Sequence, residues 1–298
     1  MTRRTLFTAA AGLAAASYSR AGQAQPEAGG AKKLTPPANG PVPVAFLISD
    51  GAVVIDFCGP WEVFQDTMLP TETDHVPGFH LYTVANNTQP VTASGGMRLI
   101  PDYSFENAPA PKVIVIPAQQ GGDAMLDWIR KAFQSADLTM SVCTGAFVLA
   151  QTGLLAGKAA TTHHGSYGQF KMEYPDIQLK RGYRFVEAGD HLATAGGLTS
   201  GMDLALRVVE RYYGRFIAER TAFYMEYEGT GWLDSTGASN AVYAAKAKGD
   251  SRTDPVCGMP VSTSAASQST YQGTTYHFCS PRCKKQFDQS PADYVAGK

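Results

Sequence analysis

The sequence of 298 residues has no excess of charge of either sign. Its 25 lysine and arginine residues nearly balance 26 aspartate and glutamate residues, which leaves a formal net charge of -1. Because a nucleic-acid-binding surface needs clustered positive charge, this balance argues against a nucleic acid as the partner. The chain also lacks an internal repeat. With 44% hydrophobic and 17% charged residues, it can build one sizeable globular core and an appended segment.

A hydrophobic run long enough for a permanent membrane anchor is missing as well. The strongest candidate is the alanine-rich stretch 6–16, and these eleven residues are too few for a membrane-spanning helix, which needs about 20. Arg3 and Arg4 precede this stretch, as in twin-arginine signal peptides. We therefore predict a signal peptide over residues 1–24 and a periplasmic or otherwise exported protein. An ordinary secretory signal is the alternative, and it also leads out of the cytoplasm.

Cysteine is scarce, and its number is odd. At least one of five thiols must therefore stay unpaired. The twin-arginine route exports folded proteins, so a metal or a reactive thiol could be installed in the reducing cytoplasm. We expect free or metal-bound thiols among Cys58, Cys143, Cys257, Cys279 and Cys283.

The order of apolar and polar segments predicts two folded parts. Residues 25–41 have few large apolar side chains, which indicates a flexible leader. Over residues 42–230, short apolar runs alternate with helical stretches, as in an α/β domain whose parallel sheet is sandwiched by helices. The expected strands are 44–49, 79–84, 113–117, 138–143, 159–162 and 191–194. The expected helices are 60–67, with Pro60 in the first turn, and 124–133, 145–152, 201–213 and 214–229.

A glycine-rich and alanine-rich linker is predicted over residues 231–252. The following residues, 253–298, are dense in cysteine, aromatic and turn residues. A segment of this size usually needs a metal ion or disulfides to hold its fold. We therefore predict a small cysteine-rich α+β metal module at the C-terminus.

Cys143 stands where a predicted buried strand turns directly into a helix, within Ser-Val-Cys-Thr-Gly at residues 141–145. This is the pattern of a nucleophile elbow, which lifts the side chain above the sheet edge. The unpaired N–H groups at the start of the following helix favour a thiolate there. Gly145 keeps the turn uncrowded. The alternative is a structural cysteine, because free cysteine is among the most buried residue types.

Further segments around this turn resemble ThiJ/PfpI (class I glutamine amidotransferase-like) domains over about residues 42–228. They are VAFLISDG at 44–51, VIDFCGPWEVF at 54–64, GLLAGKAATTH at 153–163 and AGGLTSGMDLAL at 195–206. Cys-Thr-Gly is similar to the isonitrile-hydratase branch and its regulator-domain relatives. The protease-like branch has histidine after the cysteine instead, which disfavours a peptidase. The resemblance implies a flavodoxin-like fold, a small-molecule substrate, no cofactor in this domain, and, as in many relatives, pairing into a homodimer.

By this resemblance Cys143 is the nucleophile, Asp56 its acid/base partner, and Thr144 a neighbour that positions the reacting group. A carboxyl group beside a thiol can hold or pass a proton during addition to an electrophilic carbon. Glu62 is a second carboxylate candidate. The alternative role for Asp56 is to cap the N-terminus of the following helix, and both roles can coexist.

Three other positions complete the predicted site. Family members usually supply a backbone oxyanion donor from a Pro-Gly-Gly turn, whereas residues 117–122 read PAQQGG, so Gly121 is the displaced candidate. His163 and its neighbour His164 follow a predicted strand and could face the same sheet edge, although a structural histidine explains the pattern equally well. Cys58 could line the pocket or form a disulfide with Cys143, or it could simply pack.

Three cysteines near the C-terminus have the spacing Cys-x21-Cys-x3-Cys, formed by Cys257, Cys279 and Cys283. This spacing suits a hairpin followed by a helical turn, and soft thiolates select copper or zinc over calcium or magnesium. His277 lies two residues before Cys279, on the same face of a predicted strand, and could complete the site or be structural. The alternative is a disulfide between Cys279 and Cys283.

The segments DPVCGMP at 254–260 and YQGTTYHFCSPRC at 271–283 resemble YHS domains, which are associated with heavy-metal and copper handling, over residues 253–296. Two hypotheses follow. The chain is an exported cysteine-dependent hydratase or hydrolase of isonitrile-hydratase type with a metal-binding module. Alternatively, it is a non-enzymatic periplasmic copper-binding or zinc-binding protein whose ThiJ/PfpI domain is a scaffold or thiol sensor. The sequence leaves both open, because one fold hosts many chemistries.

Overall fold

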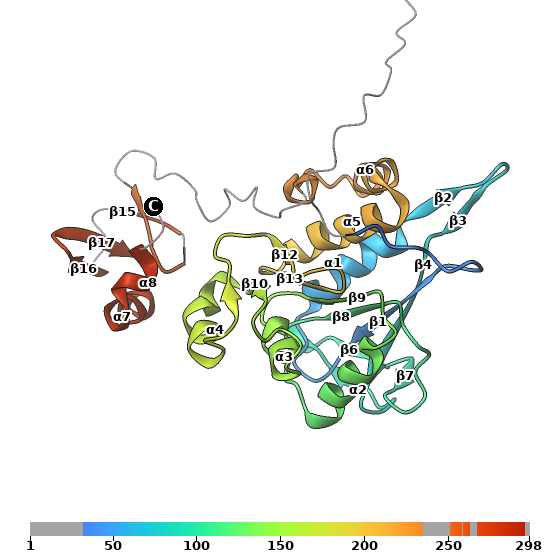
Figure 1. The fold of residues 1–298 in the computed structure, drawn as a ribbon, viewed down its shortest axis with the longest axis horizontal. Helices are drawn as coiled ribbons and strands as arrows, with labels where there is room; N and C mark the ends of the chain where they lie inside the picture. The colour runs from blue at the N-terminus through green and yellow to red at the C-terminus, as the bar shows by residue number, and fades with distance from the viewer. Residues whose placement is uncertain (1–31, 235–250, 258, 263–266, 296–298) are drawn as a thin grey trace, which may run out of the picture.

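A computed structural model describes residues 32–234, 251–257, 259–262 and 267–295 (Figure 1). The predicted signal peptide at 1–24, the leader up to residue 31, and residues 235–250 of the predicted linker lie outside these described residues. Among the residues described, none of the helices combines the length and the hydrophobicity that a membrane span requires.

A seven-stranded sheet forms the centre of the first domain, in the order β12-β13-β9-β8-β1-β4-β7. Neighbouring strands are parallel except for β12 and β13, which are antiparallel. The short apolar strands β8 and β9 are buried throughout, as expected for a sheet covered on both faces. The predicted α/β fold is confirmed. The strands are β1 (Val42–Leu47), β4 (Phe79–Ala85), β7 (Tyr103–Ser104), β8 (Val113–Ile116), β9 (Leu138–Ser141), β12 (Phe185–Glu187) and β13 (Leu192–Ala195).

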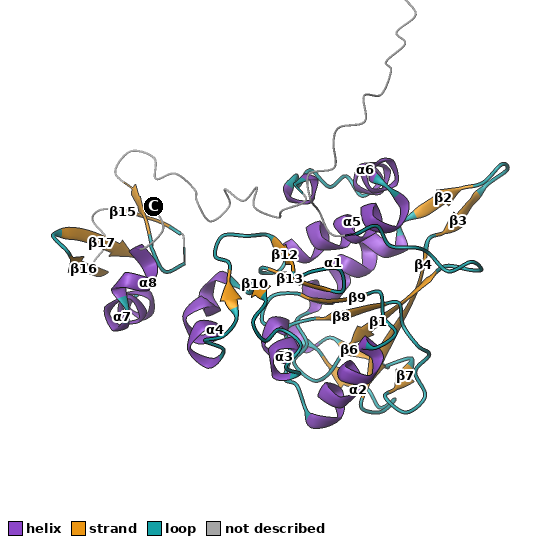
Figure 2. Cartoon of the chain, viewed as in Figure 1, coloured by secondary structure: helices purple, strands orange, loops and turns teal. Residues whose placement is uncertain are grey.

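Helices pack on both faces of this sheet (Figure 2). Successive side chains of β1 point to opposite faces, so Val44 and Phe46 join one core, with residues of α1 and α5. Ala45 and Leu47 join the other core, with residues of α2 and α3. The helices of this domain are α1 (Val54–Gln65), α2 (Asp123–Phe133), α3 (Gly145–Gln151), α4 (Tyr167–Glu173), α5 (Ser200–Tyr213) and α6 (Arg215–Tyr224).

Short elements connect these parts. The small paired strands are β2 (Met68–Pro70) with β3 (His75–Pro77), β5 (Val91–Thr92) with β6 (Arg98–Leu99), and β10 (Ala159–Ala160) with β11 (Gln178–Leu179). The 3-10 helices are η1 (Ser94–Gly96), η2 (His164–Ser166) and η3 (Gly231–Leu233).

The predicted start of the first helix is wrong. Helix α1 begins at Val54, and Pro60 lies inside it. Proline removes one helical hydrogen bond and costs about 3 kcal/mol in a helix interior, which is why the sequence favoured a first-turn position. Burial of Phe57 and Phe64 in the core offsets that cost. The helix N-cap is Val53, so the alternative role of Asp56 as the capping residue is also wrong.

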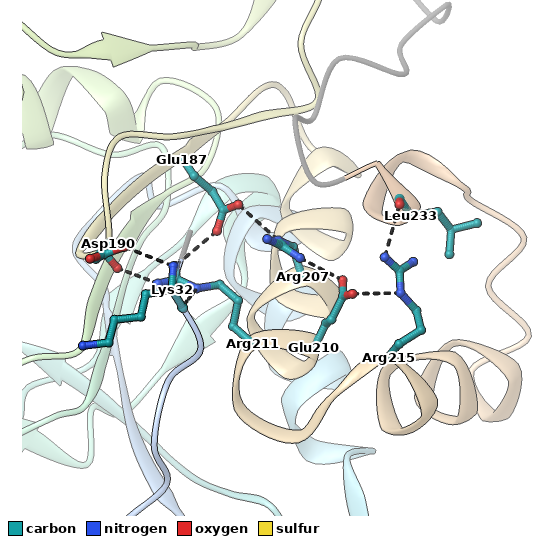
Figure 3. Close-up of polar contacts among 8 residues, drawn as sticks. All are labelled: Lys32, Glu187, Asp190, Arg207, Glu210, Arg211, Arg215 and Leu233. Atoms are coloured by element: carbon teal, nitrogen blue, oxygen red, sulfur yellow. Dashed lines mark hydrogen bonds and ion pairs between the residues drawn. The ribbon is translucent and has the colours of Figure 1, made fainter. Parts of the chain in front are cut away.

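The predicted leader is held in place from residue 32 onward. The Lys32 N–H donates to Asp190, and the Lys32 carbonyl accepts a hydrogen bond of 3.0 Å from the Arg211 guanidinium of α5. The Arg211 guanidinium also forms an ion pair of 3.2 Å with Glu187 of β12, and Glu187 forms a second ion pair, of 3.1 Å, with Arg207 of α5. Figure 3 shows these side chains side by side. This buried network ties the leader, β12 and α5 together. The leader is predicted to be flexible because it has few large apolar side chains. In the structure its main chain is instead hydrogen-bonded to Arg211 of α5.

The packed part of the first domain also extends past the predicted boundary at residue 230. Trp232 of η3 is only 3% exposed and joins the core on the α1 and α5 side. Its ring stacks against the Arg215 guanidinium, which lies 5.2 Å from the ring centroid. The sequence missed this because glycines on both sides of the tryptophan are typical of a linker.

The C-terminal module is a small α+β unit. Its core contains Val256, Phe278 and Phe287, with two cysteines at its margin. Phe287 carries much of the packing, since the rings of Tyr276 and Phe278 lie 4.8 and 5.1 Å from it. The elements are β14 (Ser251–Thr253), β15 (Pro260–Ser262), β16 (Ser267–Tyr271), β17 (Thr274–Phe278), α7 (Pro281–Gln289) and α8 (Pro291–Val295).

The two folded parts contact each other beside α4. The Arg181 guanidinium lies 4.3 Å from the ring centroid of Tyr294 in α8 and 5.7 Å from that of Tyr167 in α4. A β-carbon at Gly168 would lie 2.9 Å from the Tyr294 hydroxyl. Glycine at this position therefore leaves room for the tyrosine.

Candidate functional site

Cys143 occupies the turn between β9 and α3 with the geometry of an elbow. Its φ of 58° lies in the left-handed region, which non-glycine residues rarely adopt. The Cys143 N–H donates to the Gly196 carbonyl at 2.8 Å, and the Cys143 carbonyl accepts from the Thr162 hydroxyl at 2.9 Å. A β-carbon on Gly145 would lie 2.2 Å from the Ile116 carbonyl oxygen. Glycine is therefore required for the tight approach of α3 to β8.

Asp56, in the first turn of α1, lies in this site without exposed surface. Its Oδ2 atom accepts the Ala118 N–H at 3.1 Å, while Oδ1 has no well-formed hydrogen bond among the described residues. Burial raises the pKa of Asp56 from 3.8 to about 6, against the smaller opposing effects of the Ala118 N–H, the Cys143 thiol and the Leu198 N–H. At neutral pH the carboxyl group is therefore mostly ionised and able to accept a proton.

Cys143 is only 8% exposed and belongs to the core on the α1 and α5 side of the sheet. Burial, and after it the negative charge of Asp56, raises its pKa from 9.0 to about 12. The N–H groups of Thr144 and Leu198 act in the opposite direction. The N–H groups at the start of the helix lower the pKa of the thiol, as expected. Burial and the charge of Asp56 raise this pKa by more, so the resting group is a neutral thiol. Attack by sulfur then requires a base, and Asp56 is the adjacent one.

Leu198 is a part of the site that the sequence did not reveal. It follows Gly196 and Gly197 and has a φ of 53°, again in the left-handed region. Its backbone N–H acts on both Asp56 and Cys143, because it lowers the pKa of each. A main-chain donor leaves no side-chain signature, and only the Gly-Gly pair before Leu198 signals an unusual turn.

The two histidines border this turn. The His163 ring packs against Gly197, where a β-carbon would lie 2.4 Å from the ring. Its Nδ1 atom accepts the Gly165 N–H at 3.2 Å. Burial lowers the pKa of both His163 and His164, so both rings are neutral near pH 7. None of the described hydrogen bonds joins either ring to Cys143, and a catalytic role stays a prediction.

Three other predicted residues make no described hydrogen bond to the Cys143 thiol. Glu62 is exposed on α1 six residues after Asp56, about 600° around the helix and so on another face. Its charge acts on Cys58, whose pKa is raised by burial and then by Glu62. Cys58 is a free thiol.

Gly121, the candidate oxyanion donor, packs against Gln151 and Val148 of α3. No hydrogen bond described in the structure joins Gly121 to the Cys143 thiol, so its oxyanion role stays a prediction.

The C-terminal module brings four potential ligands together, with their donor atoms all within 4.8 Å of one another: Asp254, Cys257, Cys279 and Cys283. The Cys279 sulfur lies 3.4 Å from that of Cys257 and 3.6 Å from that of Cys283. A disulfide needs about 2.05 Å, and all three cysteines are free. The alternative of a disulfide is therefore not what the structure contains. This donor set fits a soft metal ion.

Burial raises the pKa of Cys257 and raises that of Cys283 to about 11. The negative charge of Asp254 adds to both effects. Without a metal these thiols keep their protons at neutral pH, and metal binding must release protons.

His277 is not a member of this group. Strand β17 ends at Phe278, so the alternation that would place His277 and Cys279 on one face does not reach Cys279. The His277 Nδ1 atom is buried and has no hydrogen-bond partner among the described residues. Asp254 is the residue that joins the thiols. The sequence signal for it was an aspartate before proline, three residues ahead of the first cysteine.

Comparisons with known proteins confirm both resemblances. The sequence pattern of the DJ-1/PfpI family matches residues 42–211, and that of the YHS domain matches residues 252–298. The chain is 32% identical to an isonitrile hydratase of Pseudomonas putida over 204 residues, which cover 66% of this chain and 84% of that protein. It is 44% identical over 46 residues to a copper-transporting P-type ATPase of Rhizobium leguminosarum bv. viciae, which cover 15% of this chain and 6% of that protein.

Among solved structures, a THiJ/PfpI family protein from Pseudomonas syringae matches with a TM-score of 0.56 and 25% identity. The match covers 64% of this chain and 76% of that protein. The elbow cysteine therefore lies in a fold that this structure shares.

Proposed function

We propose that this chain, which belongs to the DJ-1/PfpI family and carries a YHS domain, is a cysteine-dependent hydratase or hydrolase for a small electrophile of the isonitrile class. One observation carries the proposal. The Cys143 thiol and the ionisable Asp56 carboxyl group share a buried site with the backbone N–H groups of Thr144 and Leu198. The similarity to an isonitrile hydratase over most of the first domain supports the reaction class.

The geometry suits an addition in which Asp56 moves one proton. As the Cys143 sulfur bonds to the terminal carbon of an isonitrile, the Asp56 carboxylate accepts the thiol proton and delivers it to that carbon. Water then adds to the same carbon, the carbon–sulfur bond breaks, and the sulfur regains a proton. The net reaction adds one water and gives an N-substituted formamide without a redox step. The Thr144 and Leu198 N–H groups stabilise negative charge on sulfur during attack.

A specific observation favours a second function, the handling of copper or zinc with the DJ-1/PfpI domain as a scaffold or thiol sensor. Three free thiols gather in the C-terminal module, and this module is similar to part of a copper-transporting ATPase. In this alternative the Cys143 site does not turn over a substrate. The partners are then a metal ion alone, rather than a small molecule and a metal ion.

Two matched variants separate these functions. We expect Cys143→Ala to abolish turnover of isonitriles and small aldehydes while metal content stays at the wild-type level. Cys279→Ala should lose bound metal. Turnover that survives in Cys143→Ala would refute the enzymatic proposal. Metal binding lost in Cys279→Ala, with no turnover by any form, would support the carrier instead.

We also propose export by the twin-arginine route, on the basis of Arg3, Arg4 and the apolar stretch that follows. A double change of Arg3→Lys and Arg4→Lys should retain the protein in the cytoplasm. Fractionation of cells that produce each form tests this. Equal periplasmic amounts of the two forms would contradict the twin-arginine route, and the ordinary secretory signal would then be preferred.

A further inference from the structure

We infer that Asp254 is a positioning residue of the C-terminal metal site rather than its fourth ligand. The centre is then formed by three thiolates and has an open position beside Cys279. This inference rests on the metal-binding part of the proposed function and adds to it the coordination and the kind of ion.

Hydrogen bonds account for both oxygens of Asp254. Oδ1 accepts the Val256 N–H at 2.8 Å and the Cys257 N–H at 3.4 Å, while Oδ2 accepts the Cys279 N–H at 2.8 Å. The Asp254 N–H itself donates to the Met259 carbonyl at 2.8 Å. One carboxyl group therefore fixes the main chain of two ligand cysteines that are 22 residues apart in the sequence.

The third cysteine is fixed by a different cap. Ser280 is the N-cap of α7, and its hydroxyl accepts the Cys283 N–H at 3.2 Å. Because Ser280 follows Cys279 directly, the start of this helix holds Cys283 beside Cys279. The Asp254 carboxyl group and the Ser280 cap together hold the three sulfurs close to one another.

Direct coordination by Asp254 is less favourable than this role. The residue has no exposed surface. Its three hydrogen bonds hold the carboxyl group against the main chain of the two cysteines and leave only the second lone pair of Oδ2 for a metal ion. A soft ion also prefers thiolate to carboxylate oxygen. Structural zinc sites are closed by four ligands, whereas three thiolates suit copper(I), which accepts three-coordinate sulfur.

The exposure of the three cysteines indicates where the site is open. Cys257 and Cys283 are buried, whereas Cys279 is exposed. An incoming thiolate from another molecule can therefore approach the ion beside Cys279. This arrangement suits an ion that is received and passed on, rather than one locked in place to support the fold.

The test uses the full mature chain with three variants. Asp254→Asn keeps one oxygen acceptor but cannot accept from both sides. Asp254→Glu keeps the charge and a potential oxygen ligand but moves the carboxylate by one methylene. Asp293→Asn is the control, because it removes an exposed carboxyl group of the same module. Competition with a chromophoric copper(I) chelator gives the affinity, and X-ray absorption at the copper edge gives the ligands.

We expect Asp254→Asn and Asp254→Glu to weaken copper(I) binding by about 10–100-fold, as loss of an outer-shell partner does, and Asp293→Asn to leave it unchanged. The absorption spectra should show sulfur ligands alone in all forms. An oxygen ligand that is present in the wild type and lost in Asp254→Asn would overturn the inference, as would unchanged affinity in both Asp254 variants. A wild type that binds zinc but no copper(I) would overturn the assignment of the ion, and one that binds neither would refute the metal-binding function as well.

Discussion

Replacing Asp56 by asparagine should make the Cys143 thiol more acidic and the protein less active. The carboxylate has two opposite effects on the sulfur. Its charge raises the pKa of the resting thiol, second only to burial, and in the proposed reaction it is the base that removes the proton. Asp56→Asn removes both effects while it keeps the size of the side chain. Alkylation and turnover should therefore change in opposite directions.

The size of the change follows from the charge. Two unit charges about 4 Å apart interact by about 4 kcal/mol at an effective dielectric constant of about 20, and neighbouring charges shift pKa values by about 1–3 units. Loss of the Asp56 charge should lower the pKa of Cys143 from about 12 by about that amount. Below the pKa, each unit gives about tenfold more thiolate. Burial is unchanged, so the pKa should not fall below the ordinary value of 9.0.

The assay is the rate of alkylation of Cys143 by iodoacetamide at about pH 8, where a free thiol is only partly ionised. Peptide mapping by mass spectrometry distinguishes this cysteine from the others. We expect alkylation to be about 10–1000-fold faster in Asp56→Asn, and turnover to be about 100–10,000-fold slower, the usual contribution of general acid–base catalysis. Glu62→Gln removes the same charge from another face of the same helix and should change neither rate.

Two results would refute this reasoning. If alkylation of Cys143 is unchanged or slower in Asp56→Asn, the carboxylate does not face the thiol as the structure has it. If alkylation is faster but turnover is retained, Asp56 is not the base.

Stability gives further tests. The pKa of Asp56 is raised from 3.8 to about 6 in the folded protein. The folded protein should therefore be most stable below about pH 4, where Asp56 is protonated in both states, and should lose up to about 3 kcal/mol of its free energy of unfolding as pH rises through 6. Denaturant unfolding should show this loss in the wild type and not in Asp56→Asn. Gly145→Ala should destabilise the protein by about 3 kcal/mol or more in thermal unfolding. Gly122→Ala adds a β-carbon in open space but replaces the N-cap of α2, and should cost no more than about 1 kcal/mol. Arg181→Ala should increase the maximum dimension in small-angle scattering, because it removes the cation between the two domains; equal dimensions would contradict that contact.

The sequence predicted the sheet and the elbow because buried parallel strands leave an unmistakable signal. The runs around Val113 and Leu138 are short, continuous and apolar, and each is followed by a helical stretch. Pro60 misled the prediction because local propensity favours proline at a helix start, whereas packing of the aromatic residues around it decides the actual boundary.

The rest of the two sites depends on groups that sequence patterns do not display. Leu198 and Ala118 contribute backbone N–H groups. Asp254 accepts such a group from Cys279, which is 25 residues along the chain. The protonation state of Cys143 was also beyond the sequence, because it results from how deeply the turn is buried and not from which residues form it.

The buried, protonated thiol has a consequence for the survival of the protein in an oxidising environment. Peroxides attack thiolates, and the first product, a sulfenic acid, can proceed to irreversible forms. With the pKa of Cys143 raised to about 12, very little thiolate is present at neutral pH. In the proposed reaction, the sulfur therefore stays unreactive until Asp56 accepts its proton as the sulfur bonds to the substrate carbon.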